Sequence, residues 1–367
     1  MQKVNYLDFK SDVRVYKNEY LAAVKRVLNS GWYILGNEVE SFEKEFAKYL
    51  GVKYCVGTAN GLEAIQIALM AYGIEKDDEV ITTPVSAVAT TLAILAVGAT
   101  PVFADVSANG QMDINQIEKL ITKKTKAIIP VDLYGQPCGL DEIRKICKEH
   151  KLFLVEDACQ AHGATYNNKK LGTFGDVGCF SFYPTKNIGA FGDGGALVTN
   201  NSKLDKIYRV LRDYGQQSKY IHTRYGLNSR LDELQAALLK IKLSYLDSNN
   251  DKRRIIAQRY IAKLSVEKDL KLVLPKNIED SNFHLFVIRT SKREALQGYL
   301  KNKGISTLIH YPIAIPDQPM FGTKYKDLKI SEARKFVKET LSLPCHPFIK
   351  LDEVDYVSDK IVEFFRK

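Results

Sequence analysis

Apolar and polar positions follow two kinds of spacing between residues 52 and 200. Short runs dense in Val, Ile and Phe are separated by stretches whose apolar residues recur at helical spacing. Buried strands alternating with amphipathic helices predict an α/β fold with a mostly parallel sheet covered on both faces. The expected strands are KYCVGT, EVITTP, TPVFADV, KAIIPVDLYG, LFLVEDA, VGCFSFY and GGALVTN. The expected helices include GLEAIQIALMAYG, residues 87–97, DINQIEKLI and GLDEIRKICKEH.

The pattern changes after residue 227. Residues 228–264 favour helix and carry no glycine or proline, which predicts one or two long helices. A smaller α/β unit follows from about residue 270, with strands NFHLFVIRT and ISTLIHYP and helices REALQGYLKNKG, SEARKFVKETL and VDYVSDKIVEFFRK. We therefore expect a large domain, residues 1–245, that includes two N-terminal amphipathic helices, and a small C-terminal domain, residues 246–367.

The composition is that of a globular cytoplasmic protein. Apolar residues make up 45% and charged residues 26% of the chain, and MQKVNYLDFK does not resemble a signal peptide. The longest apolar stretch carries threonines, a glycine and a proline, so a packed helix and strand fit it better than a membrane span. The six cysteines show no metal-binding spacing, which predicts reduced thiols and no metal site.

The net charge of +10 permits two interpretations. It could attract an anionic partner such as a phosphorylated ligand, or it could reflect a solvated lysine-rich surface. Because the basic residues are scattered rather than clustered, the second interpretation is favoured and nucleic-acid binding is not expected.

Three motifs at strand ends could carry chemistry. In VEDACQAHGA, Asp157 ends an apolar run, and it is either a partnered acid or a helix N-cap. In GTANG, residues 57–61, small residues precede a helix, which fits a phosphate cradle or a plain tight turn. In FSFYPTKNIGAFGDGGALVT, Lys186 follows an apolar run, and it is either a solvent-facing charge or a buried amine with a lowered pKa that can form a Schiff base.

An acid, a phosphate cradle and an activated lysine together indicate one cofactor, pyridoxal 5′-phosphate (PLP). Lys186 would hold its aldehyde and Asp157 would keep its pyridine nitrogen protonated. The glycines after Lys186 would let the backbone pass close to cofactor and substrate. The phosphate would be held by Ala59, Asn60 and Ser181.

These motifs, with GDGGALVT and YGLNSRLDELQAALL, resemble the DegT/DnrJ/EryC1/StrS family of nucleotide-sugar aminotransferases from about Asp8 to the C-terminus. The resemblance implies the aspartate-aminotransferase fold, fold type I, with Lys186 and Asp157 in the roles given above. It implies that Gln160 bonds the phenolic oxygen of the cofactor. It also implies a homodimer with shared active sites, in which Asn228 reaches the phosphate of the neighbouring subunit's cofactor.

Two stretches, GLNSRLDELQAALLKIKLSYLD and ISTLIHYP, are similar to enzymes that aminate C-3 of TDP-linked 3-keto-6-deoxyhexoses. The resemblance implies glutamate as amino donor and a TDP-3-amino-3,6-dideoxyhexose as product. The substrate-side candidates are Tyr33, Tyr183, His310 and Tyr311, for which aromatic packing between domains is the alternative role.

The resemblance leaves other functions open. Some relatives aminate C-4, and a dehydratase branch carries histidine in place of the lysine, which Lys186 argues against. A cofactor-binding regulator without turnover is a further alternative. One position departs from the family pattern, because Ala87 stands where an aromatic side chain usually stacks on the pyridine ring.

Overall fold

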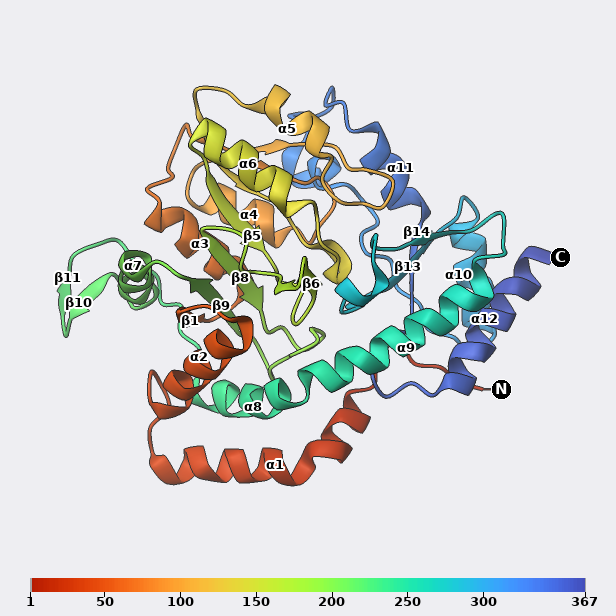
Figure 1. Cartoon of the computed structure of the whole chain (residues 1–367), viewed down its shortest axis with the longest axis horizontal. Helices are drawn as coiled ribbons and strands as arrows, with labels where there is room; N and C mark the ends of the chain where they lie inside the picture. The colour runs from red at the N-terminus through yellow and green to blue at the C-terminus, as the bar shows by residue number, and fades with distance from the viewer. Residues whose placement is uncertain (1, 367) are drawn as a thin grey trace.

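The computed structural model describes residues 2–366 and has a seven-stranded sheet at its centre, in the order β1-β9-β8-β5-β4-β2-β3 (Figure 1). The pairs from β3 through β8 are parallel, whereas β9 runs antiparallel to both β8 and β1. The predicted α/β fold with a mostly parallel sheet is confirmed. The strands are β1 (Tyr54–Thr58), β2 (Glu79–Thr82), β3 (Thr100–Phe103), β4 (Thr125–Ile129), β5 (Phe153–Asp157), β8 (Val177–Ser181) and β9 (Gly195–Thr199).

Helices cover both faces of this sheet because neighbouring strand residues point to opposite sides. Leu154 packs with one helical layer and Val155 with the other. The first layer contains α2 (Asn37–Leu50), α5 (Ile114–Leu120), α6 (Leu140–His150) and α8 (Glu233–Ser244). The second contains α3 (Gly61–Ala71), α4 (Ala89–Ala96) and α7 (Ser202–Arg212). The long helix α1 (Phe9–Ser30) packs against α8.

The C-terminal part forms a smaller unit around an antiparallel three-stranded sheet. Its strands are β12 (Lys271–Val273), β13 (Phe286–Arg289) and β14 (Thr340–Leu343), and its helices are α10 (Arg293–Asn302), α11 (Ser331–Glu339) and α12 (Leu351–Arg366). Helix α9 (Leu246–Leu264) leads from the large sheet to this unit (Figure 1). Val4 pairs with Ile305 and belongs to the small apolar core, so the first residues lie with the C-terminal unit. The boundary at residue 245 stays a prediction.

Some elements differ from the sequence-based prediction. The stretch ISTLIHYP is not a regular strand, because only Ile305 and Leu308 form isolated bridges before His310 and Tyr311 turn toward a cavity. The strands beside β13 are β12 and β14, and β14 occupies the end of a predicted helix. The unpredicted elements are α7, β12, the pairs β6 (Thr165–Tyr166) with β7 (Lys169–Lys170) and β10 (Gln216–Ser218) with β11 (Ile221–His222), and the 3-10 segments Leu133–Gly135, Ile278–Asp280, Ile315–Asp317 and Pro319–Phe321.

A distant carboxylate caps the start of α2. Its N-cap residue is Gly36, which has no side chain, and the buried carboxylate of Glu233 accepts hydrogen bonds from the backbone N–H groups of Gly36, Glu38 and Val39 at 2.8, 2.9 and 2.9 Å. A negative group satisfying the free N–H groups of a helix start stabilises that end of the helix. The cap thus ties α8 to α2 across a long sequence separation.

The substitution Glu233→Gln is expected to lower the free energy of unfolding by about 2–4 kcal/mol, because an amide removes the charge and directs a donor at the helix N–H groups. Denaturant unfolding of wild type and variant measures this loss. Glu45→Gln, at a half-exposed position on α2, is the matched control and should lower the free energy of unfolding by less than about 1 kcal/mol. Equal losses for the two variants would contradict the capping role.

Candidate active site

A cavity of about 500 Å³ lies where the carboxyl ends of the central strands meet the C-terminal unit. It brings together residues far apart in sequence, from the start of α3, the ends of β5 and β8, and the stretch after α10. The sequence-predicted residues that line it are Asn60, Asp157, Gln160, Ser181, Tyr183, Lys186, His310 and Tyr311. Ala87 also lines it, and the tyrosines on its wall are Tyr183 and Tyr311.

Asp157 is the last residue of β5 and is only 3% exposed. Its carboxylate accepts a hydrogen bond from the Thr90 hydroxyl at 2.6 Å and one from the Cys159 backbone N–H at 3.1 Å. These two donors hold the side chain of Asp157 in one orientation. The remaining surface of the group faces the cavity, so Asp157 presents a fixed anion to any bound molecule.

Two more carboxyl groups, those of Asp132 and Glu156, lie next to Asp157 in the sheet. Val131 pairs with Asp157, so the neighbouring residues Asp132 and Glu156 point to the opposite face of the sheet. The Glu156 carboxylate accepts hydrogen bonds from the backbone N–H groups of Gly172, Phe174 and Gly175. Burial and the neighbouring Glu156 raise the pKa of Asp132 well above its usual range. Burial likewise raises the pKa of Glu156, while the three backbone N–H groups act in the opposite direction.

Lys186 follows β8 in a tight turn, in which its backbone N–H donates to the Tyr183 carbonyl at 2.8 Å. The side chain is half-buried and faces the cavity. Burial lowers the pKa of the Lys186 ammonium below its ordinary value, while Cys159 and Asp157 act in the opposite direction. The neutral amine, which is the nucleophilic form, is therefore more populated at a given pH than in a solvent-exposed lysine.

The start of α3 forms one end of the cavity. Asn60 is the N-cap, and its side-chain oxygen accepts a hydrogen bond from the Glu63 backbone N–H at 2.9 Å. The first residues of the helix line the cavity together with Ser181. A helix start with N–H groups beside a hydroxyl is a suitable site for an anion.

Two of the glycines after Lys186 lie directly against protein backbone. A side chain at Gly195 would place its Cβ 2.4 Å from the carbonyl of Asn60, and one at Gly189 would place it 2.4 Å from the carbonyl of Pro184. These glycines therefore allow protein backbone to approach protein backbone. From residue 189 to 195 only Asp193 lines the cavity.

Gln160 joins the cavity to the C-terminal unit. Its side-chain oxygen accepts a hydrogen bond from the Tyr134 backbone N–H at 2.8 Å, and its side-chain nitrogen donates to the Tyr311 hydroxyl at 3.3 Å. The Tyr134 hydroxyl donates to the His310 carbonyl. Burial lowers the pKa of His310 to about 4 and raises that of Tyr311, so both side chains are neutral near pH 7.

Three predicted residues lie outside the cavity. Ala59 adjoins it, and its backbone N–H donates to the Ser229 hydroxyl at 3.2 Å. Asn228 is exposed and pairs with Asp213. Tyr33 is 54% exposed, and its carbonyl accepts a hydrogen bond from the Glu233 backbone N–H.

Sequence reasoning missed several residues on the cavity wall. Thr90 lies in an apolar helix that gives no sign of a bond to Asp157. His284 stands just before the apolar run LFVI in a strand-like stretch, and nothing in the local sequence marks it as a cavity residue. The other missed polar residues are Glu63, Ser86, Cys159, Thr185 and Asp193.

The residues present fit PLP. An anion site at the start of α3, a fixed carboxylate at Asp157 and a desolvated amine at Lys186 face one cavity. These are the groups that a phosphate, a pyridine nitrogen and an aldehyde require.

The six cysteines are free thiols. Within residues 2–366, three or more His, Cys, Asp or Glu side chains are nowhere grouped to hold a metal ion. Among the helices of the same range, none has the length and apolarity of a membrane span.

Comparison with known proteins identifies the family. Residues 15–362 match the DegT/DnrJ/EryC1/StrS aminotransferase family. The chain is 46% identical over 362 residues to the dTDP-3-amino-3,6-dideoxy-alpha-D-galactopyranose transaminase of Aneurinibacillus thermoaerophilus, covering 98% of each protein. The solved structure of DesV from Streptomyces venezuelae, with a reaction intermediate bound, superposes with a TM-score of 0.98 at 40% identity, covering 100% of both chains.

A second solved structure bears on the cofactor. NtdA of Bacillus subtilis, solved with the bound cofactor PMP, has a TM-score of 0.94 and 32% identity, covering 100% of this chain and 86% of that one. The matched family spans most of the chain, and the predicted fold type I architecture and dependence on PLP are confirmed. The protein therefore belongs to the DegT/DnrJ/EryC1/StrS aminotransferase family of PLP-dependent enzymes.

Proposed function

We propose that this protein transfers the amino group of glutamate to C-3 of a TDP-3-keto-6-deoxyhexose and forms a TDP-3-amino-3,6-dideoxyhexose. The observation that carries the proposal is the convergence of Lys186, Asp157 and the start of α3 on one cavity that His310 and Tyr311 close from the other side. The name of the Aneurinibacillus relative, a transaminase of a 3-amino-3,6-dideoxyhexose, supports the sugar and the position.

Each cavity residue then has a distinct task. PLP, when bound, supplies an aldehyde that condenses with amines and a ring that accepts electron density. Asp157 holds the proton of the pyridine nitrogen, Gln160 bonds the phenolic oxygen, and Asn60, Ser181 and the α3 N–H groups bind the phosphate. Lys186 would move a proton from the α-carbon of glutamate to C4′ of the cofactor, and in the second half-reaction it would move one from C4′ to C-3 of the sugar, acting as base and then as acid each time. Burial lowers the pKa of this amine from its ordinary value, which favours its action as a base as well as an acid.

The sugar lies, in this proposal, against Tyr183, His310 and Tyr311. The neutral state of the last two at pH 7 suits an uncharged sugar ring rather than the diphosphate. The net charge of +10 favours the approach of the anionic nucleotide, since an excess of one sign attracts ligands of the other.

We also propose a homodimer with shared active sites, in which Asn228 reaches the phosphate of the neighbouring subunit's cofactor and Tyr33 approaches the neighbouring sugar. The hairpin β10–β11 extends away from the central sheet (Figure 1). Tyr220 and Tyr225 beside it are 77% and 97% exposed, and α1 also exposes apolar side chains. Large apolar groups left in solvent favour burial against a second copy.

Mass spectrometry of the products tests the position of amination. The holoenzyme would be incubated with glutamate and both C-4 epimers of a TDP-3-keto-6-deoxyhexose, beside a 4-keto isomer. We expect an amine at C-3 of at least one epimer, and bleaching of the visible absorbance of the enzyme by glutamate alone. Faster turnover of the 4-keto sugar would contradict C-3 specificity, and binding of PLP without bleaching by any amino acid would contradict transamination.

A further inference from the structure

His284 lies on the cavity wall in a position that none of the tasks above uses. It precedes β13, is 8% exposed, and lines the cavity beside Thr185, Lys186 and His310. Its Nδ1 lies 3.1 Å from the side-chain oxygen of Asn187, the residue directly after Lys186. The hydrogen-bonding state of its other nitrogen, Nε2, follows from the groups around Asn187.

A chain of hydrogen bonds fixes the orientation of Asn187. The His162 carbonyl can only accept, so at 2.9 Å it fixes the side-chain nitrogen of Asn250 as the donor and leaves the Asn250 oxygen to accept. That oxygen lies 2.8 Å from the side-chain nitrogen of Asn187, which also donates to the Asn282 carbonyl at 3.1 Å. The Asn187 oxygen must therefore accept, and His284 must donate from Nδ1.

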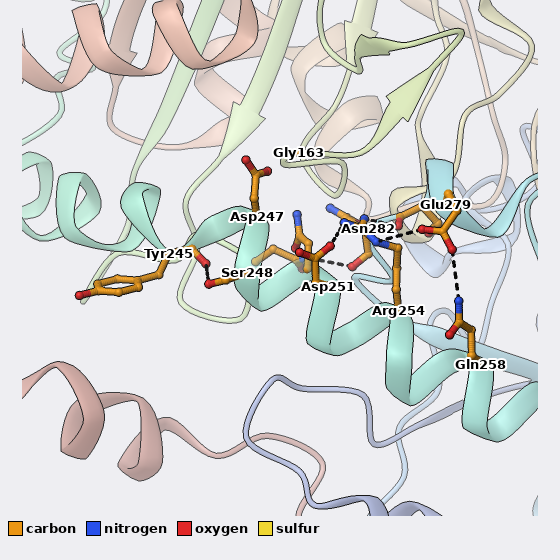
Figure 2. Close-up of polar contacts among 12 residues, drawn as sticks. Gly163, Tyr245, Asp247, Ser248, Asp251, Arg254, Gln258, Glu279 and Asn282 are labelled. Carbon is orange, nitrogen blue, oxygen red and sulfur yellow. Dashed lines mark hydrogen bonds and ion pairs between the residues drawn. The ribbon is translucent and has the colours of Figure 1, made fainter.

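The backbone around His284 is held equally firmly. The buried side chain of Asn282, beside α9 in Figure 2, accepts a hydrogen bond from the His284 backbone N–H at 3.0 Å. Its nitrogen donates to the carbonyls of Gln160 and His162 at 3.1 and 3.0 Å. Arg254, on α9, donates to the Ser281 carbonyl just before this turn. The backbone of His284 is thus fixed beside the cavity, and the bond from Nδ1 to Asn187 orients the ring.

Burial and the positive charges of Lys186 and Arg253 lower the pKa of His284 well below its ordinary value. The ring is therefore neutral near pH 7. Because Nδ1 carries the proton, Nε2 has a free lone pair and can only accept a hydrogen bond.

We propose that Nε2 of His284 binds the sugar of the substrate by accepting a hydrogen bond from a ring hydroxyl. This inference rests on the proposed function, because it assigns a contact to the sugar half of the nucleotide sugar. A neutral acceptor beside His310 and Tyr311 offers nothing to a diphosphate, which needs donors or cations, but it matches a hydroxyl donor. A fixed acceptor also selects for sugars that carry the hydroxyl, because a deoxy analogue offers this nitrogen no donor.

Two variants separate this contact from a merely structural role. In His284→Asn the side-chain nitrogen can replace Nδ1 and keep the bond to Asn187, but nothing replaces Nε2. In His284→Gln a polar group returns to the position of Nε2. The rate of the half-reaction with glutamate, turnover of the ketosugar, and calorimetric binding of TDP and of the TDP-3-amino-3,6-dideoxyhexose to the holoenzyme are measured for both variants and wild type.

We expect His284→Asn to lower kcat/KM for the ketosugar by roughly 10- to 100-fold, which is the usual cost of leaving a hydroxyl unpaired. The aminosugar should bind it more weakly by a similar factor, while TDP alone and the glutamate half-reaction are unchanged. His284→Gln should recover part of the loss. Equal losses in both half-reactions, or undiminished aminosugar binding, would overturn the assignment. Failure of the proposed function is recognised separately, because wild type would then not aminate the ketosugar.

Discussion

Replacing Lys186 with arginine is expected to lower the rate of transamination on the order of 10⁴-fold or more, because the reaction loses both its amine nucleophile and its acid–base group. Arginine keeps a positive charge in the cavity but stays protonated at every accessible pH. The half-reaction with glutamate, followed by the absorbance of the cofactor in a stopped-flow instrument, measures the effect. Borohydride reduction should attach PLP to residue 186 in wild type and leave the variant unlabelled.

Lys242→Arg is the matched control for this experiment. Lys242 is also withdrawn from water, which lowers its pKa, but it pairs with Asp12 at 3.2 Å and does not line the 500 Å³ cavity; it meets Lys186 only at a smaller adjoining cavity. Its substitution should leave the half-reaction rate unchanged. A Lys186→Arg enzyme that retains a substantial rate, or a wild-type enzyme labelled elsewhere by borohydride, would refute the assigned role.

The parts of the fold that the sequence could predict are those with strong local patterns. The parallel strands and their helices have regular apolar spacing, so the sequence predicts their order along the chain. The same pattern places Asp157 at the end of one strand and Lys186 shortly after another. Short two-residue strands such as β6 and β7 carry too few positions to show a pattern. The stretch before His310 looked like a strand because it is apolar, yet its neighbours allow only isolated bridges.

Active-site residues could be predicted from the sequence where their residue type is unusual for their position. A lysine or an aspartate beside a buried strand is unusual, whereas Thr90 is an ordinary helix residue until the fold places it 2.6 Å from Asp157. His284 becomes informative only through Asn187 and Asn250, which lie far away in sequence. Contacts that depend on three separate elements leave no local signal.

The second large effect concerns Asp157. The substitution Asp157→Asn is expected to slow the glutamate half-reaction by roughly 10²- to 10³-fold, the usual loss when one preorganised charge is removed from a buried site. Asparagine has nearly the same shape, and its oxygen can still accept the hydrogen bond from the Cys159 N–H. The loss therefore comes from the missing negative charge, which can no longer hold a proton on the pyridine nitrogen.

Asp193→Asn is the control for charge in general, because Asp193 lines the same cavity and loses the same formal charge. Absorbance-detected rates for both variants, with thermal unfolding of each cofactor-free protein, separate chemistry from folding. We expect Asp157→Asn to keep its unfolding temperature, since the hydroxyl of Thr90 can reverse its role and accept from the new amide. If both variants slow the half-reaction equally, the effect is one of net cavity charge and the pairing of Asp157 with the pyridine nitrogen is wrong.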